Sequence, residues 1–189
     1  MKILAIHGSP RIGNSKILLD EAVRICNLKK HEIKQINPCE LNISGCNACN
    51  GCSTTGVCVI RDDMDKIYPL LKDSQRIIIA SPIFFFSIPA QLKLLIDRCQ
   101  CLWYEKYVLK RFNSNESRKA LVILVGGMKK GEIGATCAEA TIKAFLRTID
   151  IKTHKTLSYL GYDNAGEILK TPSILKEVTA ETEELLKDD

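Results

Sequence analysis

The fold of this chain is decided by the stretch Lys2–Ser15, which reads KILAIHGSPRIGNS. Its first six residues, Lys2–His7, form a short and mostly apolar run, which predicts a buried strand. Gly8-Ser9-Pro10 ends that run and begins a loop. Apolar residues then recur at helical spacing, so we expect a helix that begins at Asn14 or Ser15 as its N-cap. A buried strand, a glycine-containing loop and a helix, in that order, form the first unit of an α/β fold.

Four later segments are also predicted as strands, and the two central ones are apolar throughout, as in strands that are buried on both faces. They are Glu32–Asn37, Arg76–Ala80, Lys119–Val125 and Lys152–Leu160. Helical patterns lie between them and after the last one: from Asp62-Asp63-Met64, from about Ser87, over Thr136–Ile149 and over Pro172–Lys187. This alternation predicts a doubly wound, flavodoxin-like α/β fold, with a five-stranded parallel sheet in the order 2-1-3-4-5.

Length and charge narrow the class of protein. A chain of 189 residues is long enough for one well-buried domain, over residues 1–189, and short for two. The net charge of +5 is scattered, without the basic stripe that is typical of nucleic-acid binding. No apolar run is long enough to cross a membrane, and residues 1–7 do not resemble a signal peptide. We therefore expect a cytoplasmic protein that binds neither nucleic acid nor membrane.

Four of the nine cysteines follow the second predicted strand with the spacing C-x2-C-x2-C-x5-C. They are Cys46, Cys49, Cys52 and Cys58. Thiolates are soft ligands that suit iron–sulfur clusters or zinc. Three closely spaced cysteines with a fourth nearby are more typical of a 4Fe–4S cluster. The sequence therefore predicts a cluster loop over residues 39–60, inserted after the second strand at the carboxyl edge of the sheet.

The residues alone leave three other interpretations of these cysteines open. Structural zinc is one, although its ligands usually come as two pairs that are well separated in sequence. Disulfides are another, although thiols in the cytosol mostly stay reduced. The third is a metal-free redox dithiol, because C-x-x-C pairs can act in this way.

A second candidate site lies at the carboxyl edge of the predicted sheet, where flavodoxin-like proteins bind FMN. The first loop has the chemistry of a phosphate site, because short polar side chains, glycines and one arginine stand at the N-terminus of a helix. The residues concerned are Ser9, Arg11, Gly13, Asn14 and Ser15. An ordinary turn that caps its helix would show a similar pattern.

Two further loops at the same edge suit a flat ring. Pro82, Ile83, Phe84 and Phe85 place aromatic side chains at the end of a buried strand, where an isoalloxazine ring would contact them. Gly126-Gly127 leaves room beside that ring. Core packing for the phenylalanines and a simple turn for the glycines are the alternatives.

Taken together, these motifs resemble the iron–sulfur flavoproteins of the NADPH-dependent FMN reductase superfamily. The resemblance covers residue 1 to about residue 150. Besides the three loops and the cysteines, it includes Asp62-Asp63-Met64, Pro89-Ala90, Lys93 and Asp97-Arg98. It implies FMN at the carboxyl edge and a 4Fe–4S cluster on the four cysteines. It also implies a homodimer or homotetramer in which one subunit's cluster lies near a neighbour's flavin.

The function that follows is electron transfer between a one-electron donor such as ferredoxin, the 4Fe–4S cluster, FMN and an acceptor that the sequence does not identify. One alternative is a cluster-free reductase that uses NAD(P)H as its donor and reduces FMN, quinones or azo compounds. A thiol-based redox sensor or a structural zinc module is the alternative from another class.

Overall fold

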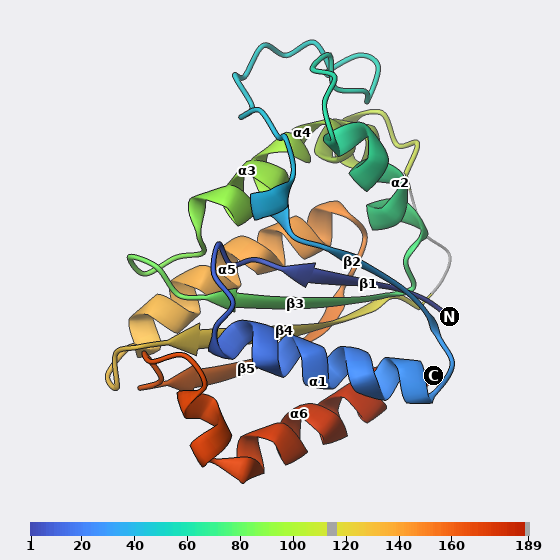
Figure 1. Ribbon diagram of the computed structural model, residues 1–189. Coiled ribbons are helices and arrows are strands. Elements are labelled where there is room, and N and C mark those ends of the chain that lie inside the picture. Colours follow the sequence, from blue (N-terminus) through green and yellow to red (C-terminus); the bar gives the residue numbers. More distant parts are fainter. Residues whose placement is uncertain (113–116, 188–189) are drawn as a thin grey trace.

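The computed structural model describes residues 1–112 and 117–187. Its five strands form one sheet in the order β2-β1-β3-β4-β5 (Figure 1), and every neighbouring pair is parallel. The strands are β1 Lys2–His7, β2 Glu32–Ile36, β3 Arg76–Pro82, β4 Lys119–Gly126 and β5 Thr153–Leu160. The predicted flavodoxin-like fold and strand order are therefore confirmed.

Helices cover both faces of this sheet (Figure 1). One face packs against α1 Asn14–Leu28 and α6 Pro172–Leu185. The other packs against α2 Met64–Asp73, α3 Ala90–Arg98, α4 Gln100–Trp103 and α5 Glu132–Thr148. Three short helices, η1 Pro38–Glu40, η2 Tyr104–Val108 and η3 Glu167–Lys170, lie in the connections.

The apolar runs of the central strands form both cores at once. In β3, Ile77 and Ile79 face the side of α2, α3 and α5, whereas Ile78 and Ala80 face the side of α1 and α6. All four are fully buried. Because side chains alternate between the two faces of a strand, a strand covered on both sides has no position for a polar residue.

Strand β3 extends further than the sequence predicts, since it includes Ser81 and Pro82. Proline lacks an N–H group and usually ends a strand. Here the register of β1 with β3 ends at His7 and Ala80, and only β4 continues beside Pro82. Pro82 therefore extends the strand beyond the last residue of β1, where no pairing with β1 needs its missing N–H group.

Two helices also differ from the prediction. Helix α1 has Gly13 as its N-cap, without a side-chain cap, and Asn14 is its first helical residue. Helix α5 begins at Glu132 instead of Thr136. Pro69 lies inside α2, which ends at Asp73. Among the described residues, no helix has the length and apolar character to cross a bilayer.

The cysteine loop follows the carboxyl end of β2 and extends away from the sheet. The chain leaves β2 through η1, and the loop then projects over the ends of α2, α3 and α4 (Figure 1). Helix α3 separates the two regions: it begins after the loop that follows β3 and ends at Arg98, which faces the cysteines. A helix of 9 residues is about 13 Å long. The loop follows the carboxyl end of β2, as predicted, and its cysteines lie beside Arg98 at the far end of α3.

Candidate functional site

A cavity of about 390 Å³ opens at the carboxyl edge of the sheet, within the range of about 300–1,000 Å³ that is usual for ligand sites. It includes all the residues predicted to bind a cofactor except Phe85 and Gly126. Its lining residues are Ser9, Arg11, Gly13, Asn14, Ser15, Pro82, Ile83, Phe84, Val125, Gly127, Met128, Tyr162, Asp163 and Ala165. We call it the edge cavity.

One wall of the edge cavity is the N-terminus of α1. No side chain caps this helix and no acidic residue lies in its first turn. The buried hydroxyl of Ser9 donates to the Arg11 main-chain oxygen at 2.9 Å and accepts from the Arg11 main-chain N–H at 3.2 Å, which fixes the turn before the helix. An uncapped helix N-terminus presents N–H groups and partial positive charge, so this wall suits a phosphate.

His7 lies buried at the end of β1, next to this wall, but does not line the edge cavity. Burial, followed by the positive charge of Lys16, lowers the pKa of His7. The imidazole is therefore neutral near pH 7, and it adds no positive charge to the phosphate wall.

Asn14, which lines the edge cavity as predicted, also joins two of its walls. Its side-chain Nδ2 donates to the main-chain oxygens of Tyr162 at 3.2 Å and Asn164 at 2.9 Å. Its Oδ1 accepts from the main-chain N–H of Ile168 at 3.3 Å. Asn14 lines the edge cavity, but these bonds direct its amide to the segment that follows β5. It positions one wall of the cavity against another.

That segment, Tyr162–Ala165, is a wall that sequence reasoning missed. Gly161 turns the chain with φ +86, and the Gly161 and Tyr162 N–H groups donate to the Gly126 oxygen at 2.8 and 3.0 Å. A Cβ atom on Gly127 would lie 2.8 Å from Oδ1 of Asp163. Gly127 is therefore needed for a close approach of the two loops. The signal in the sequence is Gly161-Tyr162-Asp163-Asn164, because this polar turn directly follows a predicted strand at the ligand-binding edge.

The remaining wall carries an unusual turn. The main-chain N–H and C=O groups of Phe84 and Ser87 pair at 2.8 and 2.9 Å, so Phe85 and Phe86 form a two-residue turn. Both have positive φ, +46 and +60, which is strained for bulky residues. Phe85 is fully exposed. Strain of this kind is often found at functional sites.

Phe85 and Gly126 line a second, apolar cavity of about 270 Å³ that shares Ile83, Gly127 and Met128 with the edge cavity. Its other lining residues are Phe86, Gly131, Gly134 and Leu160. The two residues that lie outside the edge cavity therefore border the space next to it.

The four predicted cluster ligands line one common cavity, which we call the cysteine cavity. It measures about 30 Å³, room for about two or three water molecules. Cys46 and Cys49 are exposed, Cys58 is half-buried and Cys52 is buried. Within residues 1–112 and 117–187, no group of three or more His, Cys, Asp or Glu residues is close enough to hold a metal ion. The loop thus brings four thiols to one cavity, but their sulfur atoms are not as close together as the ligands of one metal ion.

The cysteine cavity also includes Arg98 and a fifth cysteine, Cys101, both from the region where α3 meets α4. Cys101 is buried, and burial raises the pKa of its thiol, although a hydrogen bond with Tyr68 opposes this shift. Cys39 lies on η1 and does not line the cavity. The donor set of four thiols from one loop, all lining the cysteine cavity, fits an iron–sulfur cluster.

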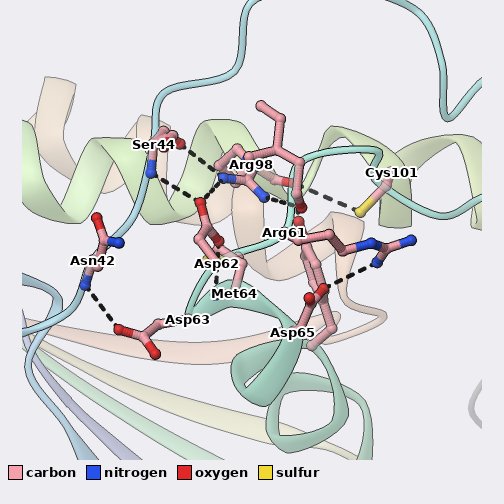
Figure 2. A network of polar contacts seen from close by, with 11 residues as sticks. Asn42, Ser44, Arg61, Asp62, Asp63, Met64, Asp65, Arg98 and Cys101 are labelled. Atoms are coloured by element: carbon pink, nitrogen blue, oxygen red, sulfur yellow. Dashed lines mark hydrogen bonds and ion pairs between the residues drawn. The ribbon is translucent and has the colours of Figure 1, made fainter.

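Arg98 forms hydrogen bonds with residues before and after the four cysteines, as Figure 2 shows. Its Nη1 donates to the Ser44 oxygen at 2.9 Å and to Oδ2 of Asp62, and its Nη2 donates to the Ile60 oxygen at 3.1 Å. Asp62 in turn accepts from the N–H groups of Ser44 at 3.0 Å and Met64 at 2.9 Å. One buried ion pair therefore joins the chain before the cysteines to the chain after them.

The charge state of this pair follows from its contacts. Burial opposes ionisation of Asp62, but hydrogen bonds from Arg98, Ser44 and Met64 outweigh it and lower the pKa of the carboxyl group. The side chains of Arg98 and Asp62 are 0% and 3% exposed. Both are therefore charged near pH 7 in a nearly dry environment.

Residues 1–159 match the NADPH-dependent FMN reductase family. The chain belongs to this family. The match covers the whole sheet up to β5 and both loops that were predicted to contact a flavin ring. The expected membership of the FMN reductase superfamily is thus confirmed.

Among its relatives are iron-sulfur flavoproteins, which confirms the resemblance to that group. One, from Methanosarcina thermophila, is 33% identical over 132 residues, which is 69% of this chain and 66% of the relative. Another, from Methanocaldococcus jannaschii, is 38% identical over 103 residues, which is 54% of this chain and 53% of the relative. The chain therefore spans about half to two thirds of the length of these relatives.

The fold is shared with solved flavin enzymes. An NAD(P)H:quinone oxidoreductase from Methanothermobacter marburgensis superposes with a TM-score of 0.75, over 100% of this chain and 98% of the other. The two sequences are 16% identical, so this likeness supports the fold alone.

Proposed function

We propose that this protein is an electron-transferring iron–sulfur flavoprotein that binds FMN in the edge cavity and a 4Fe–4S cluster on Cys46, Cys49, Cys52 and Cys58. One domain, residues 1–189, would carry both, with the cluster loop over residues 39–60. The observation that carries the proposal is the presence of two separate sites in one family member: a cavity with a helix N-terminus, and four thiols around a second cavity.

Different residues of the edge cavity bind the phosphate and the ring of FMN. The uncapped N-terminus of α1, with Ser9, Arg11 and Ser15, holds the phosphate by N–H and hydroxyl donors and by one positive charge. Ile83 and Phe84 provide an apolar wall for the ring, and Gly127 leaves space for it. The adjoining apolar cavity leaves room for an electron acceptor or a nicotinamide beside that ring.

When bound, FMN takes electrons singly or in pairs and a 4Fe–4S cluster takes them one at a time, so together they join a one-electron donor to two-electron chemistry. The protein holds each site and sets its electrostatics. Because α3 separates the two cavities of one chain, we propose a homodimer or homotetramer in which the cysteine loop approaches a neighbour's edge cavity. Ferredoxin or NAD(P)H is the proposed donor.

A second candidate function is a cluster-free reductase that takes electrons from NAD(P)H and passes them to FMN, a quinone or an azo compound. Two observations favour it. Among the described residues, the cysteines are not close enough together to hold a metal ion, and an apolar cavity lies next to the edge cavity. Such a reductase needs only the carboxyl edge of the sheet and leaves the cysteines as free thiols.

Quantification of flavin, iron and sulfide on one anaerobically purified sample tests the proposal. We expect about one FMN, four iron and four sulfide atoms per chain, in line with a 4Fe–4S cluster on four thiolates. The Cys49→Ser variant should lose iron and keep FMN. Cys137→Ser changes an exposed cysteine of α5 and should keep both. Bound FMN with negligible iron in the unmodified protein would favour the cluster-free reductase.

A further inference from the structure

In the part of the chain that the structure describes, the guanidinium nitrogen Nε of Arg98 has no hydrogen-bond partner. Two of its nitrogens donate to Ser44, Ile60 and Asp62, as described above. Its Nε is buried and forms no hydrogen bond within residues 1–112 and 117–187. Buried donors in native proteins are nearly always paired, so we expect the Nε–H group of Arg98 to have an acceptor in the functional protein.

The cysteine cavity is where that acceptor would come from. Arg98 lines this cavity together with all four predicted cluster ligands. Burial lowers the pKa of Arg98, but Asp62, Tyr68 and then Cys58 outweigh it and raise the pKa. Cys58 lines the cysteine cavity together with Arg98, and its sulfur accepts no hydrogen bond from Nε. A thiolate or a bound cluster would supply the negative charge.

The guanidinium cannot easily turn away from the cavity. Its other nitrogens are held by two main-chain oxygens and by the buried carboxylate of Asp62 (Figure 2). Arg98 is 1% exposed and lies in the last turn of α3, where a positive charge is favoured by the helix dipole. The Nε–H group therefore stays next to the sulfur ligands.

We propose that Arg98 is a positioning residue that raises the reduction potential of the cluster, by donating from Nε to the sulfur of Cys58 or to the cluster and by placing its charge beside it. Asp62 on the far side of the guanidinium partly offsets that charge. The inference rests on the proposed function. A positive charge and hydrogen bonds to sulfur stabilise the reduced cluster, which carries one more electron.

The two charges predict shifts of opposite sign. Arg98→Met removes the positive charge and the Nε–H donor, so reduction of the cluster should become about tenfold less favourable, a fall of about 59 mV for a one-electron couple. Asp62→Asn leaves Arg98 in place without its counter-charge, so the potential should rise. Arg98→Lys keeps a charge but has no Nε–H group, and it should give a smaller fall than Arg98→Met.

The experiment is an EPR-monitored redox titration of the anaerobically purified full-length protein and its variants. The matched control is Arg61→Met, because Arg61 is an exposed arginine close to Cys58 in sequence that pairs with Asp65 on the surface. This control should keep the potential of the unmodified protein. Where Arg98→Met fails to retain the cluster, the sign of the Asp62→Asn shift decides.

The inference would be overturned by reduction potentials that are unchanged, or that shift in the same direction in the Arg98 and Asp62 variants. A purely structural role of Arg98 does not predict potential shifts of opposite sign in these variants. Iron and sulfide content separates this outcome from failure of the proposed function. A normal content with unshifted potentials overturns the role of Arg98 alone. Absence of iron and sulfide from the unmodified protein overturns both.

Discussion

Asn14 and Tyr162 are 148 positions apart in sequence, yet the Asn14 side-chain amide donates to the Tyr162 main-chain oxygen at 3.2 Å. The same amide group reaches Asn164 and Ile168. The helix that would hold a phosphate and the segment that closes the edge cavity are therefore fixed to each other by one buried side chain.

Asn14→Asp replaces both amide donors by an acceptor that faces the main-chain oxygens of Tyr162 and Asn164. We expect the free energy of unfolding to fall by about 1–3 kcal/mol, because a buried group loses its partners. Urea denaturation measures this, and FMN affinity should fall in parallel. The control is Asn164→Ala, which keeps the main-chain acceptor and removes only a side-chain contact at 3.5 Å with Glu167. Equal stability of Asn14→Asp and the unmodified protein would contradict the role of Asn14.

Gly127→Ala places a Cβ atom where Oδ1 of Asp163 would lie 2.8 Å away. The segment after β5 must then move away from β4, so we expect FMN to bind about tenfold more weakly, or about 1.4 kcal/mol. Flavin fluorescence titration measures the Kd. The double variant Gly127→Ala with Asp163→Gly removes all three side-chain atoms of Asp163 that a Cβ on residue 127 would approach, and it should restore most of the affinity. A double variant as weak as the single one would show that the clash is not the cause.

Much of the fold could be predicted from the sequence because the signals are local. Runs such as Ile77-Ile78-Ile79 can only be buried on both faces, and their alternation with helical patterns leads to a parallel sheet. Most of the residues that line the edge cavity were predicted for the same reason, since they lie at or after the ends of strands β1, β3 and β4.

The missed parts depend on contacts between distant segments. Tyr162 and Asp163 belong to the edge cavity because Gly126, Gly127 and Asn14 hold them there, and no short motif encodes that contact. The place of the cysteine loop depends on Arg98, which bonds to the chain on both sides of it. The cysteine spacing predicts a ligand set but not which part of the protein the loop packs against.

Asp62→Asn should also change how stability depends on pH. The pKa of Asp62 is lowered in the folded protein, so its contribution to stability is fully present above the unfolded value of about 3.9 and is lost as the pH falls through the folded value. At pH 7 we expect the variant to lose about 3 kcal/mol, because the buried charge of Arg98 loses its partner. Urea denaturation between pH 3 and 7 should show this difference shrinking below about pH 4. A difference that stays constant with pH would exclude ionised Asp62 as its source.

Phe85→Gly should stabilise the protein. Phe85 has φ +46 and is fully exposed, so the substitution relieves strain and loses little packing. We expect a gain of about 1 kcal/mol in the free energy of unfolding. Phe86→Gly is the comparison, because Phe86 has φ +60 but its ring packs against Gly134. This variant should therefore gain less stability. A loss of stability in Phe85→Gly would mean that its side chain has packing partners.

The central claim, that electrons from a one-electron donor reach the flavin through the cysteine-bound cluster, is tested most directly by anaerobic stopped-flow reduction with reduced ferredoxin. The unmodified protein and Cys49→Ser, both loaded with FMN, are compared by flavin absorbance. We expect flavin reduction to slow by at least about tenfold in Cys49→Ser, a loss of at least about 1.4 kcal/mol of transition-state stabilisation. Equal rates in the two proteins would contradict the account.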